Sequence, residues 1–380
     1  MLSAASSQTK ARFDDSTDSV TVNAAGAARR RYSKEDATPS TGLQEPLPPD
    51  STDDQGLVNR VLAILAKSGE AIPYAIVASA ALALATPQAF TWITSPWYAP
   101  LLGYLMFSVG VNLSLDSFVE VFKQPQKILV GSIGQWAVKP AVAWLLSAVA
   151  VPAFHLPAAI SSGLVLVGAV AGAQLSNYAT FLIEPKQAPL AIVLTALSTG
   201  AGIVLTPLLA LLMLGKSIPI DAGAMALSIA QIVVIPVGAG LACNRLAPRA
   251  VSKAKPLLQA GSLLDTCMLV CGSLAPNAAA AKSPLGLQVA APVMAFHGIS
   301  FLLGWQLASR TIAKSNVPLA RCITLSTGMQ SSVLALLLAT QFFDDPIVRL
   351  TCGLSLIIMT LGGFGLVLWW QRQREATAQI

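Results

Sequence analysis

Charged side chains are scarce in this sequence, and their distribution is uneven. Asp, Glu, Lys and Arg make up 11% of the 380 residues, whereas a soluble globular domain carries about 25%. Residues 1–56 hold nine of the 18 acidic and six of the 24 basic residues, so the rest of the chain has about one charge per twelve residues. That is too little charge to cover a surface in contact with water, which excludes a soluble fold for most of the chain.

Residue types that carry enzyme chemistry are also few. The chain has two histidines, far apart in sequence, and its five cysteines show no zinc-ligand spacing with a histidine. An intramembrane enzyme needs a nucleophile with a base, or a set of metal ligands, at one depth. We therefore predict that the protein is not an enzyme and has no metal centre or organic cofactor.

Long apolar runs dominate the chain from about residue 57. The sequence is 54% hydrophobic with a mean hydropathy of +0.65, and a helix needs roughly 20 apolar residues to cross a bilayer. We predict an all-α integral membrane protein with ten transmembrane helices and the lipid bilayer as its solvent. The predicted spans are 71–86, 98–114, 128–152, 158–183, 188–214, 221–243, 258–275, 286–309, 318–341 and 347–370.

Composition divides the chain into three regions. Residues 1–56 are rich in Ser, Thr, Ala, Pro and acidic residues and contain no apolar run, so we predict a disordered N-terminal tail or transit region. The first 13 residues suit an organelle transit peptide, whereas the aspartates that follow favour a cytosolic or stromal tail. Residues 57–371 form the predicted ten-helix domain, and residues 372–380 form a polar C-terminal tail.

Basic residues mark one side of the predicted membrane domain. With ten spans, the even-numbered loops and both termini share a side and carry most of the Lys and Arg. The odd-numbered loops carry only Lys216 and Lys282, with Arg349 at a helix start. The positive-inside rule therefore places both termini on the cytoplasmic or stromal side. Because these charges lie in short loops and not on one soluble face, the net charge of +6 does not indicate a nucleic-acid partner.

Two predicted spans differ from the plain Leu, Val and Ala helices. The fourth reads Gly168-Ala-Val-Ala-Gly-Ala-Gln-Leu-Ser-Asn177 and the ninth reads Leu325-Ser-Thr-Gly-Met-Gln-Ser-Ser332. Glycine weakens a helix, and polar groups are stranded in lipid unless they face inward. Each span is the fourth in a set of five, and such matched interruptions are typical of inverted repeats with a site at the membrane midplane. The alternative is close packing through small residues. We predict breaks near Ala171–Ser176 and Thr327–Gln330 that approach each other.

Two ionisable side chains lie inside other predicted spans. Lys139 lies near the centre of the third span, where a cation is costly unless it is hydrated or paired, and Gln135 shares its helix face. Asp265, in the seventh span, is the only carboxylate clearly inside a span. Three alternatives stay open for Asp265: it pairs with Lys139, it binds a cation, or it lies near the membrane interface.

Three segments resemble the bile acid:sodium symporter superfamily, in particular its plastid sodium/metabolite cotransporter branch. They are Gly172-Ala-Gln-Leu-Ser-Asn-Tyr-Ala-Thr180, Gly134-Gln-Trp-Ala-Val-Lys-Pro140 and Thr327-Gly-Met-Gln-Ser-Ser-Val-Leu-Ala335. The resemblance covers about residues 70–370. It implies ten helices in two inverted five-helix repeats, divided into a panel domain and a core domain, with the broken fourth and ninth helices crossing at their breaks.

The resemblance also implies which residues form the site. Sodium-coupled members have two sodium sites at the crossing, with a glutamate between them at the position that is Ser326 here, and a further serine that is Ala191 here. The candidate cation-binding residues are Gln135, Ser176, Asn177, Thr195, Ser326, Thr327, Met329 and Gln330. The candidate substrate-binding residues are Lys139, Gln174, Ser331 and Asp265.

These observations predict a secondary transporter that moves small organic anions, such as carboxylate metabolites, by alternating access. The resemblance implies the inner membrane of the plastid envelope as its location. Coupling to sodium, coupling to protons and uncoupled transport stay open as alternatives, so Na⁺ is the one ion considered as a ligand. A passive channel of the same fold is a further alternative, although channels usually show rings of pore-lining residues and this chain shows two single breaks. The oligomeric state is not indicated.

Overall fold

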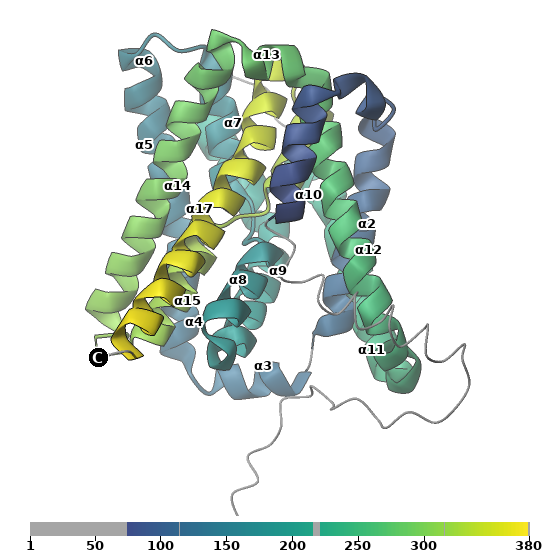
Figure 1. Ribbon diagram of the computed structural model, residues 1–380, viewed down its shortest axis with the longest axis vertical. Helices are drawn as coiled ribbons and strands as arrows, with labels where there is room; N and C mark the ends of the chain where they lie inside the picture. Colours follow the sequence, from purple (N-terminus) through teal and green to yellow (C-terminus); the bar gives the residue numbers. More distant parts are fainter. Residues whose placement is uncertain (1–73, 114, 216–220, 315, 379–380) are drawn as a thin grey trace, which may run out of the picture. The chain divides into compact units, whose positions relative to one another are not determined.

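The computed structural model describes residues 74–113, 115–215, 221–314 and 316–378. The predicted N-terminal region 1–56 lies outside the described residues. Within them the chain is helical and forms no β-strand, which confirms the predicted all-α membrane fold class at this level (Figure 1).

Helical segments lie in each of the ten apolar ranges predicted from the sequence (Figure 1). In chain order they are Tyr74–Ala85, α2 (Ser95–Asn112), α4 (Pro125–Ile133) with η2 (Gly134–Val138), α5 (Lys139–Leu145), η3 (Leu146–Ala150) and α6 (Val151–Ala153), α7 (Ala158–Ala169) with α8 (Gln174–Ile183), α9 (Ala188–Leu214), α10 (Ala222–Ile229) with η5 (Ala230–Val234) and α11 (Ile235–Leu246), α12 (Pro248–Leu274), α14 (Pro284–Thr311), α15 (Val317–Gly328) with α16 (Ser332–Phe342), and α17 (Pro346–Ala378). The connecting helices are η1 (Pro87–Phe90), α3 (Leu115–Phe122), η4 (Pro185–Gln187), η6 (Ala275–Asn277) and α13 (Ala278–Lys282).

Among the described residues, six helical stretches are long and apolar enough to cross a membrane by themselves. They are Pro125–Ala153, Pro185–Leu214, Ala222–Leu246, Ala260–Lys282, Pro284–Thr311 and Pro346–Ala376. Large apolar side chains such as Val204, Leu212 and Leu264 are exposed on the outside of such helices. Exposed apolar surface of this kind is expected where lipid replaces water as the solvent.

Two of the membrane helices, Pro125–Ala153 and Ala222–Leu246, contain three widened π-helical turns, and each turn ends two residues before a proline. The backbone N–H groups of Lys139, Val151 and Ile235, each followed directly by proline, donate to the carbonyl five residues earlier instead of four. Proline has no N–H to donate and its ring collides with the preceding turn, so the helix widens to keep its other backbone groups bonded. The first of these turns, η2, contains Gln135.

Helix packing concentrates around two helices. In the first group, α2 packs mainly on α11 and α12. Gly110 and Gly240 lie at the α2–α11 crossing, where a side chain at either position would collide with the backbone of the other helix. Small residues allow this close approach, which van der Waals packing then stabilises inside a bilayer. In the second group, α14 packs mainly on α15 and α17.

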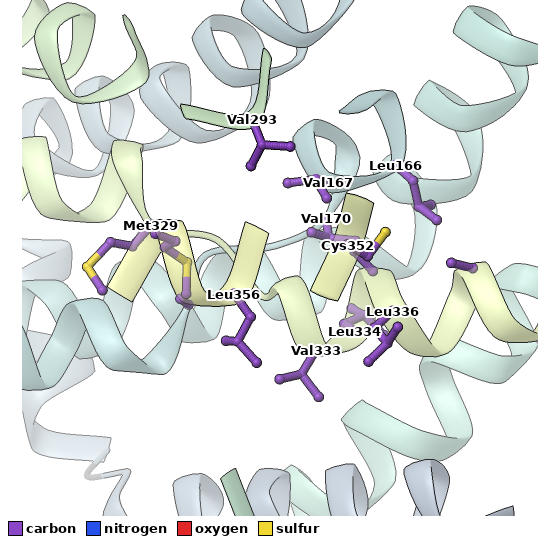
Figure 2. Packing of buried hydrophobic residues seen from close by; sticks show 14 of the residues in the cluster. Leu166, Val167, Val170, Val293, Met329, Val333, Leu334, Leu336, Cys352 and Leu356 are labelled. Atoms are coloured by element: carbon purple, nitrogen blue, oxygen red, sulfur yellow. The ribbon is translucent and has the colours of Figure 1, made fainter. Parts of the chain in front are cut away.

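The most buried apolar side chains lie where α7, α14, α16 and α17 meet. Figure 2 shows Val167 and Val170 of α7 and its end, Val293 of α14, Leu334 of α16 and Leu356 of α17 in one cluster. Because lipid tails are as apolar as these side chains, their burial stabilises the fold through close packing more than through removal from water. The cluster packs around the C-terminal end of α7 and the start of α16, which are the segments next to the two helix interruptions.

The last helix is longer than its apolar part. Of the residues predicted as a polar tail, 372–378 belong to α17, which continues as far as Ala378, and 379–380 lie outside the described residues. The polar end of α17 makes specific contacts, which are described with the site.

Candidate functional site

Two helix interruptions meet at the centre of the site. The first break lies between α7 and α8, and the second lies between α15 and α16; we call these four segments half-helices. The N–H of Ala173 donates to the carbonyl of Met329 at 3.2 Å, and the N–H of Ser331 donates to the carbonyl of Ala171 at 2.9 Å. The two breaks therefore cross as a short antiparallel bridge and satisfy part of each other's backbone.

The first break is capped by side chains from neighbouring helices. The ammonium of Lys139 is fully buried and donates to the carbonyl of Val170, the residue that caps the C-terminal end of α7, at 3.0 Å. Such a carbonyl has no partner inside its own helix, and the C-terminal end of a helix favours positive charge. On the other side of the break, the N–H of Gly172 donates to Ser198 Oγ at 3.1 Å.

The predicted cation ligands beside the first break are bonded to one another or to the backbone. The hydroxyl of Ser176 donates to the carbonyl of Ala173 at 2.6 Å. The hydroxyl of Thr195 donates to Asn177 Oδ1 at 2.8 Å. Asn177 and Thr195 are therefore in contact, and the side-chain oxygens of all three residues already have partners within the chain.

The predicted cation ligands around the second break are different. In the part of the chain that the structure describes, both amide atoms of Gln135, the hydroxyls of Ser326 and Thr327, and Oε1 of Gln330 are buried without a hydrogen-bond partner. Buried polar atoms are nearly always bonded, so these unpartnered oxygens need an explanation. Uncharged amide and hydroxyl oxygens are suitable ligands for a small hard cation such as Na⁺.

Close approaches at two glycines bring this set of residues together. A Cβ atom on Gly172, in the first break, would lie 2.9 Å from Gln135 Nε2, and a Cβ on Gly134 would overlap the hydroxyl of Thr327. The Gln135 side chain therefore lies against the first break, while its own helical turn lies against the end of α15. The widened turn η2 places Gln135 between the two breaks.

His297 on α14 caps the second break. Its Nδ1 lies 3.0 Å from the carbonyl of Gly328, the last residue of α15, so Nδ1 must carry the hydrogen. Its Nε2 lies 2.9 Å from Ser355 Oγ, which lies 2.9 Å from Ser332 Oγ. The Nε2 atom of Gln330 lies 3.3 Å from the ring. The ring has a full set of partners as a neutral imidazole.

A small cavity opens beside the crossing. It is lined by Met106, Ala171, Gly172, Gln174, Thr199, Gly202, Ile229, Val233, Ser331 and Leu334. Of the predicted substrate contacts, Gln174 and Ser331 line it, whereas Lys139 and Asp265 do not. Gln174 Nε2 also contacts Met106 Sδ of α2 at 3.4 Å, so the cavity lies between the breaks and the α2 group of helices.

Asp265 is buried on α12, the helix that packs on α2. Its two carboxylate oxygens have no hydrogen-bond partner among the described residues, and the ion pairs found there do not include Asp265 with Lys139. The alternative in which Asp265 pairs with Lys139 is therefore not realised in this structure.

A buried ion cluster, which the sequence analysis did not predict, joins the outer ends of the half-helices. Glu184, just after α8, accepts from Arg321 of α15 at 2.8 Å and from Arg374 of α17. Arg374 also donates to the carbonyl of Ile183 at 2.6 Å, and the Arg321 guanidinium stacks over the Trp370 ring at 5.4 Å. Arg374 belongs to the segment predicted as a tail.

Some residues of the site gave only a weak sequence signal. Ser198 donates to the carbonyl of Thr195 within its own helix at 2.9 Å, and it also accepts from the N–H of Gly172 in the first break. Ser332 belongs to the interrupted segment of the ninth predicted span but was not assigned a role, and Ser355 is a single serine in an apolar helix. Helices can absorb such hydroxyls into their own backbone, so only the fold distinguishes the ones that cap a break.

Two interrupted helices that cross beside a cavity, with polar groups gathered there inside an apolar helical bundle, define a membrane transport protein. No catalytic set is needed to explain these residues. The chain belongs to the sodium bile acid symporter family, whose sequence profile matches residues 99–282. The resemblance predicted from the three motifs is confirmed, and so is the prediction of a transporter and not an enzyme.

Several relatives support this membership. The chain is 44% identical over 313 residues, 82% of this chain and 76% of the relative, to the "probable sodium/metabolite cotransporter BASS6, chloroplastic" of Arabidopsis thaliana. It is 44% identical over 317 residues, 83% and 79% of the two chains, to the protein named as BASS5 in Oryza sativa subsp. japonica. It is 31% identical over 306 residues, 80% and 92%, to the "uncharacterized sodium-dependent transporter YocS" of Bacillus subtilis.

Proposed function

We propose that the protein is a secondary transporter that carries a small organic anion across a membrane by alternating access, with the substrate bound at the crossing of the two breaks. The observation that carries this proposal is the bridge between the breaks beside a cavity. Four helix ends meet there: the C-terminal ends of α7 and α15 and the N-terminal ends of α8 and α16. Helix ends carry opposite partial charges, so one place can hold an anion and a cation together.

The anion is proposed for the cavity side of the crossing. Gln174 is the first residue of α8 and Ser331 directly precedes α16, and both line the cavity. The free N–H groups at the start of a helix bind carboxylate and phosphate groups well. The relatives named as sodium/metabolite cotransporters agree with a metabolite as substrate, and we propose a carboxylate metabolite.

Sodium is the coupling ion that the chemistry favours. The unpartnered oxygens of Gln135, Ser326, Thr327 and Gln330 supply ligands of the right type, and the names of the relatives specify sodium. Met329, a predicted cation-binding residue, already uses its backbone carbonyl to bond the first break. Coupling to protons and uncoupled transport are outcomes that the experiment below distinguishes.

The ten spans are proposed to form two inverted five-helix repeats. Two groups of helices are proposed to move relative to each other during transport. The panel group would contain α2, α11 and α12, and the core group α7, α8 and α14 to α17. The interrupted helices occupy matching fourth places, and α2 touches the core at Gln174. We place the protein in the inner membrane of the plastid envelope with both termini stromal, in line with the chloroplastic relatives and the loop charges.

Purified protein in proteoliposomes provides the test. A panel of small carboxylates is offered outside, with an inward sodium gradient, a proton gradient or neither. The proposal expects saturable uptake of at least one carboxylate, accelerated by the sodium gradient. Uptake that rises linearly with concentration without saturation would indicate a channel, and uptake driven only by the proton gradient would reassign the coupling ion.

A further inference from the structure

The two breaks have matched caps. Lys139 Nζ donates to the carbonyl of Val170 at 3.0 Å, and His297 Nδ1 donates to the carbonyl of Gly328 at 3.0 Å. In both pairs the donor precedes the acceptor by 31 residues. Both acceptors lie at the C-terminal end of a 12-residue half-helix, α7 in one case and α15 in the other. Each half of the chain therefore contains one side-chain donor that caps the C-terminal end of its interrupted half-helix.

The chemistry of the two caps differs. The Lys139 ammonium donates hydrogen bonds and accepts none, and it brings a positive charge to the negative end of α7. His297 donates from Nδ1 and contacts the Ser355 hydroxyl with Nε2, so the ring needs no charge to complete its hydrogen bonds. The negative end of α15 has a hydrogen-bond donor without a charge.

The unpartnered oxygens follow the same division. Ser326, Thr327 and Gln330 lie at the end of α15 and in the second break, and Gln135 reaches them from η2. Beside the first break, where the charged cap is, the side-chain oxygens of Ser176, Asn177 and Thr195 are bonded within the chain. Among these residues, three of the four with unpartnered oxygens belong to the break without a charged cap, and the fourth, Gln135, lies between the two breaks.

We propose that Lys139 acts as a tethered cation for the first break, so that each chain binds one dissolved monovalent cation, at the second break, instead of two. The ligands of that ion are the oxygens of Gln135, Thr327 and Gln330. This inference rests on the proposed transport function and states its ion stoichiometry. The ammonium also lies beside the anion site, because Val170 directly precedes Ala171, which lines the cavity.

The number of bound ions is measured without transport. Detergent-purified protein is dialysed to equilibrium against radioactive sodium, with choline chloride keeping the ionic strength constant. One ion per chain is expected, and it should disappear in Gln330→Ala. A count of zero or two in the unaltered protein would overturn the proposal, as would a Gln330→Ala protein that retains its ion.

The charge of Lys139 is tested with a matched pair of variants. Lys139→Gln keeps a donor for the carbonyl but removes the charge, so the anion concentration at half-maximal uptake should rise by about tenfold. Lys139→Arg restores the charge and should recover most of that loss. Lys282→Gln makes the same change at an exposed lysine on α13, outside the site, and should stay within about twofold of the original value. Equal effects of Lys139→Gln and Lys282→Gln, or no effect of Lys139→Gln, would refute the tethered-cation role.

The two levels of proposal fail in different ways. If no carboxylate is transported but dialysis still counts one sodium per chain, the transport proposal is wrong and the ion stoichiometry stands. If carboxylates are transported and the count is zero or two, the stoichiometry is wrong and the transport proposal stands. Retained sodium binding in Lys139→Gln also shows that this variant is folded.

Discussion

The first and second breaks share the same backbone arrangement but differ in the side chains that bond to it. At the first break, side chains from α5, α8 and α9 bond the backbone groups and the side chains of Asn177 and Thr195, and Lys139 donates to the helix end. At the second break, a neutral imidazole caps the helix end and several oxygens stay without partners. A break completed by its own side chains is part of the scaffold, whereas a break left incomplete is a place for a ligand. The contrast therefore predicts a structural role for the first break and a ligand-binding role for the second, although the two segments look equivalent in sequence.

The largest expected effect comes from the incomplete break. Gln330→Ala removes an oxygen that nothing else in the chain replaces, so sodium-driven uptake should fall at least about tenfold, towards that of empty vesicles. Gln341, an exposed glutamine at the end of α16, provides the matched control, and Gln341→Ala should transport normally. Uptake by Gln330→Ala within twofold of the original protein would return this residue to a packing role.

The Glu184 ion cluster links the outer ends of α8 and α15, and a variant of Glu184 tests how much this link contributes to stability. Glu184→Gln leaves two arginines without their carboxylate, and removing one partner of a buried ion pair costs about 3–5 kcal/mol. Because the Arg374 side chain is 46% exposed, we expect the lower end of that range, seen as a reduced thermal midpoint in detergent. Glu120→Gln on α3, where the glutamate is exposed, should leave the midpoint unchanged. Equal midpoints for the two variants would contradict the cluster's structural role.

A smaller effect is expected from the completed break. Asn177→Ala and Thr195→Val each break the same 2.8 Å hydrogen bond, so each should slow uptake by only a few-fold, the equivalent of about 1 kcal/mol. Since the two residues act as a pair, the double variant should be little worse than either single variant. Additive losses, or complete loss in both single variants, would mean that these oxygens bind an ion directly and that the two breaks do not differ.

The smallest effect is expected at Asp265. This carboxylate is buried without a partner among the described residues and does not line the cavity, so Asp265→Asn removes a costly charge and no interaction. Uptake should stay within about twofold of the original value, and the thermal midpoint should be equal or higher. A severe loss of uptake would make Asp265 part of the transport site on the α2 side of the cavity.

Much of the fold followed from hydropathy, because the cost of exposing backbone to lipid leaves few structures other than helices. The predicted breaks near Ala171–Ser176 and Thr327–Gln330 overlap the observed interruptions between Ala169 and Gln174 and between Gly328 and Ser332. Glycine and polar residues in mid-span were a sufficient signal there. The ten-span, two-repeat arrangement and the ion ligands stay predictions.

Other features could not be read from local sequence. The π-helical turns depend on how each helix accommodates a proline, and the X-Pro pairs within the spans could have suggested them. The Glu184 cluster joins residues more than a hundred positions apart, so no periodicity announces it. The position of Asp265 relative to Lys139 required knowing which helices are neighbours. For the Glu184 cluster and for Asp265, the missing information concerned long-range packing.

The hydrogen bonds that tie the two breaks together are made by the main chain. The donors and acceptors at Ala171, Ala173, Met329 and Ser331 belong to every amino acid except, for the donors, proline. Substitution can therefore change the residues that line the cavity without dismantling the crossing that supports it. Over evolutionary time, descendants of one ancestral scaffold could then diverge in the metabolites they accept while inheriting the same crossing unaltered. Selection for a different substrate acts on the side chains that line the cavity. The bridge is made by main-chain groups, so it is retained while the lining changes.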